Sequence, residues 1–411
     1  MTFNPMWLLS LIPIIIGIVL IVVYNKKFYV NKNRGVLNSI KVENYETADG
    51  SGSNPTPTIP NLPSGAEAVG QLYTASTSLL TIYLIQVFVY LFKSNKLPYA
   101  TTNSKAIATI QDFINSQLNQ TKWVFNRPPI ITVKQILTYT CPGLFTQNFE
   151  YGGMIVEYKA PQDFLIQNSP YVIVPVIVYR GTQTNCEWGQ DFSSKLVTPT
   201  WIPINNPQNP IQVHNGFNNM YTTVNKNTKT SVQSQIWSYI NINPYPMYIV
   251  TGHSLGGGLT YLTSSDVTAK KLRDKFKFFP IAGPYSGNQE FVNYIVQSSP
   301  VIPPVPGYTG LFATINNSDP VPNTQFNPQY ARVPSQLFCF TTPPSYTGSE
   351  VHVPQTYGAF INLNQALFNQ NALNTSCGEC AAKIDSAKDV LWASIKDRKY
   401  SAITELSVFR K

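Results

Sequence analysis

The stretch YIVTGHSLGGG, residues 248–258, decides the fold of this chain. Its first four residues are apolar or β-branched and predict a short buried strand, and residues 259–272 are compatible with a helix. A serine between two glycines at such a strand-to-helix turn is typical of a nucleophile elbow. Gly252 and Gly256 leave space where strand and helix crowd together, so that Ser254 can expose its hydroxyl. We predict that Ser254 is a nucleophile, and the alternative is a glycine-rich turn with an idle serine.

A serine hydroxyl is a weak nucleophile at neutral pH, so it needs a base, which is normally a histidine held by a carboxylate. The chain has only three histidines. His253 is adjacent to Ser254 and must point elsewhere, and His214 lies upstream of the serine. After a strand-elbow-helix serine the usual chain order is nucleophile, acid and then base, which leaves His352. A histidine in a surface loop is the alternative for His352.

The acid that would orient His352 should lie between Ser254 and His352. Asp319 follows a predicted strand, residues 311–315, and a loop after a strand is where such acids lie. The other acids considered fall in predicted helices: Asp266, Asp274 and Glu290. We predict Asp319 as the acid, and the alternative is a turn residue before Pro320.

The composition fits a folded protein with a neutral, polar surface. Of the 411 residues, 43% are hydrophobic and 13% aromatic, so a substantial core can form, and only 12% are charged. A peptide hormone and a disulfide miniprotein are excluded, and the composition argues against wholesale disorder. The net charge of +9 contains no long Lys/Arg block, which argues against nucleic-acid binding.

The cysteines and glycines indicate neither a metal site nor a nucleotide cofactor. Five cysteines are an odd number without framework spacing, so we expect a domain that works with reduced thiols. Cys377 and Cys380 have C-x-x-C spacing, but no second pair lies nearby to complete a zinc site. Walker and dinucleotide glycine patterns are missing from the sequence, so no cofactor is expected.

The amino-terminal segment predicts a membrane anchor. Residues 7–24 contain about eighteen uncharged residues, close to the roughly twenty that span a bilayer as a helix. Lys26, Lys27, Lys32 and Arg34 follow the apolar run, so the positive-inside rule places the catalytic domain in the cytosol. The abundance of Asn, Tyr and Ile suits an AT-rich genome, such as that of a protist or a large DNA virus, and hence an intracellular or viral membrane.

A second apolar run, residues 79–92, is shorter than a full span. We expect a buried or interfacial helix there, and the alternative is a second transmembrane helix that would invert the topology. The predicted organisation is an anchor (1–25), a basic juxtamembrane segment and Pro/Gly/Ser/Asn-rich linker (26–64), a catalytic domain (65–365) and a helical tail (366–411).

Several separated motifs together resemble the class 3 lipases, the α/β-hydrolase group that includes fungal triacylglycerol lipases and diacylglycerol lipases. They are Tyr179-Arg180-Gly181-Thr182 with Trp188 and Asp191, Val213-His214-Asn215-Gly216-Phe217, Gly252 to Gly257, Ala282 to Asn288, Asp319 to Pro322, and His352 with Tyr357. The resemblance covers residues 172–360. Tyr285 departs from it, because an arginine is common at that position in the family.

The resemblance implies an α/β fold of the α/β-hydrolase type with a mainly parallel central sheet, here preceded by the transmembrane helix. It also implies an oxyanion hole from the backbone N–H and hydroxyl of Thr182 and the backbone N–H of Leu255. Residues 183–190, with Trp188 as a substrate-binding residue, would form a lid, and the alternative is an ordinary loop. His214 would be structural.

We therefore expect a membrane-anchored serine lipase that hydrolyses acylglycerols or membrane glycerolipids through Ser254, His352 and Asp319. Its partners would be a lipid ester substrate and the membrane, without nucleic acid. Two alternatives stay open. One is a phospholipase, acyltransferase or esterase with the same triad, and the other is an inactive lipase-like structural membrane protein.

Overall fold

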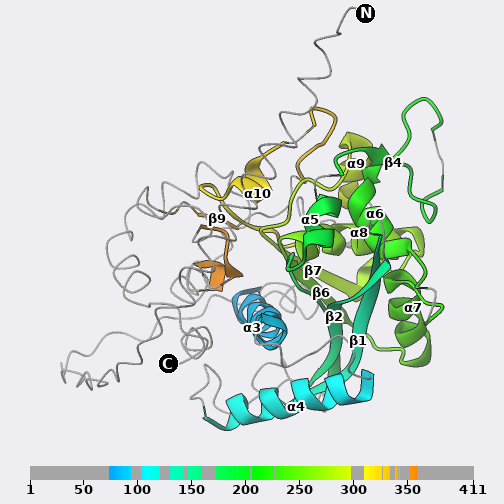
Figure 1. The fold of residues 1–411 in the computed structure, drawn as a ribbon. Coiled ribbons are helices and arrows are strands. Elements are labelled where there is room, and N and C mark those ends of the chain that lie inside the picture. The colour runs from blue at the N-terminus through cyan, green and yellow to red at the C-terminus, as the bar shows by residue number, and fades with distance from the viewer. Residues whose placement is uncertain are drawn as a thin grey trace, which may run out of the picture. The chain divides into compact units, whose positions relative to one another are not determined.

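Seven strands form one sheet in the order β1-β2-β3-β6-β7-β8-β9 (Figure 1). The computed structural model describes residues 74–93, 103–120, 130–142, 147–159, 173–191, 193–203, 206–225, 228–297, 310–325, 327–333, 338–340, 342, 351–354 and 356–358. All of them belong to one compact unit, Leu62–Lys411.

The strands are β1 (Ile130–Pro142), β2 (Gln147–Lys159), β3 (Ile173–Tyr179), β4 (Leu196–Val197), β5 (Val213–His214), β6 (Tyr248–His253), β7 (Phe276–Ile281), β8 (Thr314–Asn316) and β9 (Phe338–Phe340). The helices are α3 (Thr74–Lys93), α4 (Asn103–Gln120), α5 (Asn185–Asp191), α6 (Asn215–Thr222), α7 (Val232–Ile242), α8 (Leu255–Ala269), α9 (Gln289–Gln297) and α10 (Pro320–Asn323), with a 3₁₀ turn, η2, at Arg273–Lys275. Strands β4 and β5 form a separate small sheet.

The large sheet is mixed but mostly parallel. Strands β3, β6, β7, β8 and β9 run parallel to one another, whereas β1 pairs antiparallel with β2 and β2 antiparallel with β3. The expected mainly parallel α/β-hydrolase sheet is confirmed. The long β1–β2 pair at the edge was not predicted, and it supplies the antiparallel part.

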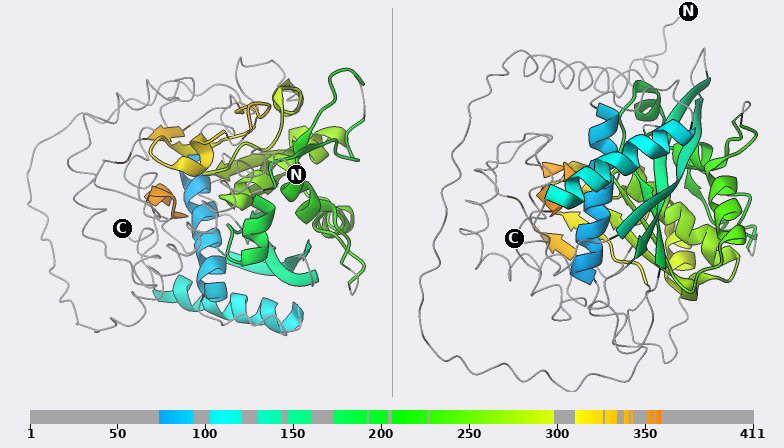
Figure 2. Two further views of the ribbon diagram at one scale, coloured as in Figure 1. Left: turned by 45° about the horizontal axis from the view of Figure 1, so that its top comes forward. Right: turned by 90° about the horizontal axis from the view of Figure 1, so that it is seen from below.

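Helices cover both faces of this sheet, as the two views of Figure 2 show. Alternate residues of β3 point to opposite faces, since Val174, Val176 and Val178 join one buried cluster and Ile177 and Tyr179 join the other. The first cluster contains the apolar side chains of α3 and α4, and the second contains those of α6, α7, α8 and α9. Burial on both faces explains why the central strands read as continuous apolar runs.

Helix α3 contains the second apolar run. Its side chains from Leu80 to Val89, and Leu91, are buried, and many of them join the core cluster beneath the sheet. No helix in the described ranges combines the length and the hydropathy that crossing a bilayer requires. The burial of α3 agrees with the buried helix expected for residues 79–92, in the part that the structure describes.

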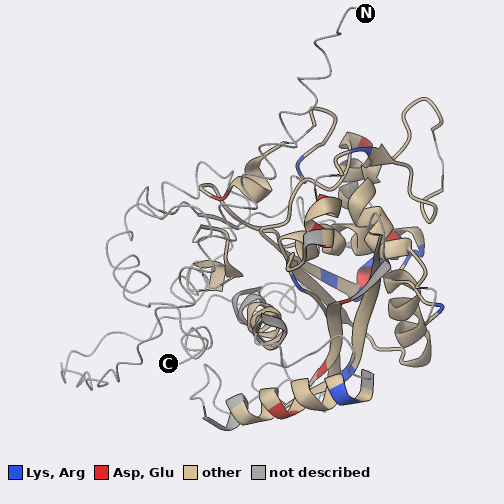
Figure 3. Cartoon of the chain, in the orientation of Figure 1, with Lys and Arg blue, Asp and Glu red and all other residues tan. Residues whose placement is uncertain are grey.

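Several predictions concern residues outside the described part of the chain. These are the anchor (7–24), the basic segment and linker (26–64), the tail (366–411) and the pair Cys377 and Cys380. Within the described part, charged side chains are sparse over the ribbon (Figure 3), in keeping with the 12% of charged residues.

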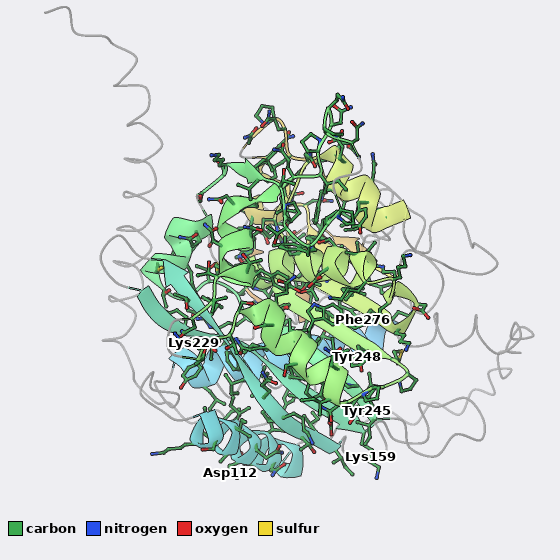
Figure 4. All side chains as sticks on the ribbon, turned by 90° about the vertical axis from the view of Figure 1, so that its right-hand side faces the viewer. Asp112, Lys159, Lys229, Tyr245, Tyr248 and Phe276 are labelled. Carbon is green, nitrogen blue, oxygen red and sulfur yellow. The ribbon has the colours of Figure 1, made fainter. Side chains whose placement is uncertain are left out.

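Aromatic packing joins the two central strands where they begin. Tyr248 stacks on Phe276 with ring centroids 4.7 Å apart, at the starts of β6 and β7 (Figure 4). The Tyr248 hydroxyl donates to the carbonyl of Asn243 at 2.7 Å and accepts the N–H of Tyr245 at 2.8 Å. These contacts close the turn between α7 and β6 and fix the start of the strand that leads to Ser254.

Candidate active site

Ser254 occupies a strained turn between β6 and α8. Its backbone has φ 59° and ψ −124°, a left-handed conformation that non-glycine residues rarely adopt. A Cβ on Gly256 would lie 2.7 Å from the carbonyl oxygens of Tyr179 and Arg180, and one on Gly252 would meet the Gly256 backbone. The positive φ of Ser254 between strand and helix shows that the predicted elbow is present. Both glycines are needed, because a Cβ at either position would collide with backbone atoms.

The hydroxyl of Ser254 lies in a chain of hydrogen bonds with the predicted base and acid. His352 Nε2 is 2.8 Å from Ser254 Oγ, and His352 Nδ1 is 2.7 Å from Asp319 Oδ2. Ser254 follows β6, Asp319 follows β8 and His352 lies beyond β9. The three residues therefore meet at the carboxyl end of the parallel strands, where α/β sheets place their sites.

The carboxylate of Asp319 is fully buried and has two further donors. Its Oδ1 accepts the N–H of Val321 at 2.9 Å, and its Oδ2 accepts the hydroxyl of Tyr357 at 2.7 Å. The Tyr357 hydroxyl in turn accepts the N–H of Asn316 at 3.2 Å. Burial and the adjacent Asp319 charge hold the pKa of Tyr357 well above its ordinary value, so this hydroxyl remains a donor.

A buried ion pair holds the loop after β3. Arg180 Nη2 is 2.7 Å from Glu187 Oε1, and both side chains are fully buried. Glu187 Oε2 also accepts the N–H groups of Gln183 and Thr184 at 2.6 and 2.9 Å, and Arg180 Nη1 donates to the Gly181 carbonyl at 2.8 Å. The backbone on both sides of Thr182 is thereby fixed. Sequence reasoning had not assigned this role to Arg180 and Glu187.

The same loop lies against the elbow. A Cβ on Gly181 would be 3.3 Å from the Cβ of Ser254, so Thr182 follows directly after a residue in contact with the nucleophile. Leu255 is the first residue of α8, where backbone N–H groups have no acceptor within the helix. Thr182 and Leu255 thus lie on the two segments that adjoin Ser254, as an oxyanion hole requires.

The Thr182 hydroxyl is bonded to the last residue of α5. It donates to Asp191 Oδ2 at 2.6 Å. Burial raises the pKa of Asp191 to about 7, although the bond from Thr182 opposes that rise. The main-chain carbonyl of Asp191 also lies 3.2 Å from His214 Nε2.

His214 is a structural residue at the start of α6. Its Nδ1 accepts the N–H of Phe217 at 3.4 Å, so Nε2 carries the proton and donates to Asp191. The imidazole stacks on the Phe217 ring with centroids 4.1 Å apart. Burial lowers the pKa of His214 to about 4, against the smaller effect of the Asp191 carbonyl. These contacts support the loop without touching Ser254.

Helix α5 occupies the segment expected as a lid and includes Trp188, which is partly buried. Contact of Trp188 with substrate stays a prediction. Cys186 in the same helix forms a disulfide, whose partner is not among the side chains that the structure describes. The expectation of reduced thiols is therefore wrong for Cys186. The spacing of the cysteines could not predict this disulfide, because the other cysteines are distant in sequence and only folding brings two of them together.

Among the described residues, no group of three or more His, Cys, Asp or Glu side chains is arranged to hold a metal ion. The site consists of a serine, a histidine, a carboxylate and two backbone segments that supply N–H donors. This arrangement can activate a hydroxyl for attack on a carbonyl carbon.

Comparison with known proteins agrees with that chemistry. Residues 176–328 match the family described as Lipase (class 3). The segment that contains the elbow is thus similar to class 3 lipases. The matched lipase segment contains Thr182, Ser254 and Asp319, and His352 lies beyond its end.

The relatives include enzymes from plants and fungi. The chain is 33% identical over 132 residues to Phospholipase A1-Ialpha2, chloroplastic, from Arabidopsis thaliana, covering 28% of this chain and 27% of that protein. It is 30% identical over 128 residues to a lipase from Rhizomucor miehei, covering 30% of this chain and 32% of that protein. The alignments thus span about a third or less of these relatives. The Rhizomucor miehei lipase propeptide complex superposes with 19% identity and a TM-score of 0.35 over 62% of this chain and 65% of that one.

Proposed function

We propose that this chain is a serine ester hydrolase that acts on glycerolipids. The observation that supports this most strongly is the continuous Ser254–His352–Asp319 bond chain, built on an elbow with positive φ at the serine. A scaffold protein would need neither the strained serine nor the fully buried carboxylate behind the histidine. The lipase-like segment supplies the class of substrate.

In the proposed reaction, Ser254 Oγ attacks the ester carbonyl while His352 Nε2 takes its proton. The C–O bond to the alcohol then breaks, and His352 returns the proton to the leaving alcohol. Water attacks the acyl-enzyme with His352 again as base, which releases the fatty acid and restores Ser254. Asp319 keeps the histidine proton on Nδ1 and stabilises the imidazolium. The backbone N–H groups of Thr182 and Leu255 would bind the oxyanion.

Within the glycerolipids, phospholipase A1 activity is the candidate beside hydrolysis of acylglycerols. It is favoured by the similarity to Phospholipase A1-Ialpha2 and to a second phospholipase A1, Phospholipase A1-Igamma2, from the same plant. The chemistry at Ser254 is the same for both candidates, so they differ only in the alcohol that leaves. An acyltransferase would differ in the acceptor that replaces water.

Fatty-acid release from triacylglycerol, diacylglycerol and phosphatidylcholine dispersions tests the proposal and separates the candidates. We expect release from at least one of them, and loss of release in Ser254→Ala. Ser264→Ala is the matched control, since Ser264 is buried on α8, the helix that follows Ser254, and has no hydrogen-bond partner among the described atoms. Undiminished release by Ser254→Ala would refute the nucleophile. No release from any ester would favour the inactive structural protein.

We further propose that residues 7–24 hold the enzyme at a membrane. The support is the uncharged run of the sequence. Full-length protein should stay with membranes through alkaline washes, whereas a chain that begins near Ser64 should not. Retention of the shortened chain would contradict the single anchor.

We propose the cytosolic side for the catalytic part on the basis of the basic residues after Tyr24. The disulfide at Cys186 weighs against that side, because disulfides persist mainly in oxidising compartments. Protease treatment of sealed vesicles decides between them. In vesicles whose cytosolic face is outside, digestion of the catalytic part would support the cytosolic side that the basic residues predict. Protection would support the oxidising side that the disulfide indicates.

A further inference from the structure

The residue before the nucleophile also contacts the catalytic base. His253 Nε2 lies 2.6 Å from the main-chain carbonyl oxygen of His352. His352 Nε2 lies 2.8 Å from Ser254 Oγ. Two successive residues of the elbow therefore bind the two ends of one residue, with His253 on its main chain and Ser254 on its imidazole.

The direction of the first bond follows from its chemistry. A carbonyl oxygen can only accept, so the Nε2 atom of His253 must carry the hydrogen and donate it. His253 is only 5% exposed, and water has little access to replace this bond. A bond of 2.6 Å in such a site restrains the His352 backbone closely.

The ring of His253 lies between the two segments that serve Ser254. Its centroid is 4.7 Å from the His352 ring and 6.0 Å from the Tyr357 ring. On the other side, a Cβ on Gly181 would lie 3.2 Å from His253 Nδ1. The imidazole thus fills the space between the segment of the base and the loop that contains Thr182.

We propose that His253 is a positioning residue, whose Nε2–H holds the His352 main chain so that its imidazole reaches Ser254 and Asp319 together. The expected effect of His253 on kcat rests on the proposed ester hydrolysis. His352 needs both contacts at once, and a shift of its backbone would lengthen one or both of them. Misplacement of a catalytic group by about 1 Å can cost roughly 10²-fold in rate.

A matched pair of substitutions isolates the donor. His253→Gln places an amide N–H near the position of Nε2, and His253→Met has a similar length and no donor. With a soluble short-chain ester, we expect His253→Met to lower kcat about 10-fold or more with KM within about two-fold, since only the aligned reaction is affected. His253→Gln should keep most of the wild-type kcat. Thermal unfolding identifies variants that fold, and His253→Leu replaces the Met variant if the latter does not.

A second measurement needs no substrate. The His352 Nδ1–H proton in the 2.7 Å bond to Asp319 is expected to give a low-field NMR signal that reports the alignment of the pair. This signal should be the same in wild type and His253→Gln, and shifted or lost in His253→Met. Equal signals in all three proteins, or equal kcat in the Gln and Met variants, would overturn the inference. If the wild type hydrolyses no ester, the proposed function fails, and the NMR comparison still decides the role of His253.

Discussion

The hydroxyl of Thr182 donates to Oδ2 of Asp191 at 2.6 Å, which joins the loop after β3 to the end of α5. The sequence had suggested that this hydroxyl itself serves the oxyanion. In this structure its proton points to Asp191, and the backbone N–H groups of Thr182 and Leu255 remain for the oxyanion. A protonated Asp191 could instead donate to Thr182, and that would release the hydroxyl proton toward the substrate.

Thr182→Val tests the contribution of the hydroxyl. Valine keeps the backbone N–H and the approximate volume, but it removes the hydroxyl and with it the bond to Asp191. If a protonated Asp191 frees the Thr182 hydroxyl for the oxyanion, kcat of the valine variant should fall about 100-fold with little change in KM, as for loss of one oxyanion donor. Thr182→Ser is the control and should retain much of the activity. Equal kcat for the valine variant and the wild type would limit Thr182 to its backbone.

His214 should make stability depend on pH. Its pKa is lowered to about 4 in the folded protein, against about 6.5 when unfolded, so the unfolded chain binds the proton first as pH falls. This contribution is complete above pH 6.5 and is lost toward pH 4, by about 3 kcal/mol.

The substitution that checks this is His214→Asn, because asparagine is neutral and still caps α6. Urea unfolding of both proteins between pH 4 and 8 gives the two stability curves. The variant should lose less free energy of unfolding than the wild type over the acidic range, whatever its absolute stability. Parallel curves would show that His214 does not titrate with folding.

Two glutamines clamp the main chain of strand β1. Gln235 from α7 accepts the Thr138 N–H at 3.0 Å and donates to the Thr138 carbonyl at 2.6 Å. Gln111 from α4 makes the same type of contact with the N–H of Val133 and the carbonyl of Ile131, at 2.8 and 2.9 Å. Only the Gln235 contact is buried.

Gln235→Leu should therefore cost about 2–4 kcal/mol of unfolding free energy, because it leaves two buried backbone groups without partners. Gln111→Leu is the matched control and should cost about 1 kcal/mol, since water can replace its bonds. Denaturant titration measures both variants. A loss at Gln235 no larger than that at Gln111 would contradict the role of burial.

Tyr357→Phe removes the hydroxyl that donates to Asp319 and accepts from Asn316. Both neighbours are fully buried, so we expect a loss of about 1–3 kcal/mol in unfolding free energy. Turnover should also fall, because Asp319 loses one of the bonds that orient it. Chemical denaturation and steady-state kinetics check the two effects. Wild-type stability in the phenylalanine variant would show that Tyr357 does not hold the acid.

Local patterns predicted the elbow and the parallel strands well. The run before Ser254 is continuous and apolar because β6 is buried on both faces, and Gly252 and Gly256 are required by close backbone contact. The chain order of serine, acid and base then selected Asp319 and His352, which the structure brings within hydrogen-bond distance of one another and of Ser254.

Contacts between distant segments could not be predicted from local sequence patterns. The ion pair of Arg180 and Glu187 and the disulfide of Cys186 depend on how a loop folds back, which no periodicity records. His253 was expected only to point away from Ser254. Its bond to the His352 carbonyl involves the main chain of a residue 99 positions later, and main-chain acceptors are invisible in a sequence.

The most direct test of the whole account is the site at which a fluorophosphonate probe reacts, located by mass spectrometry of the full chain. We predict a single modification, on Ser254, whose rate falls by several orders of magnitude in His352→Ala because the serine then has no base. Modification at another residue, or labelling of Ser254 that is undiminished in His352→Ala, would contradict the assignment of the Ser254–His352–Asp319 triad.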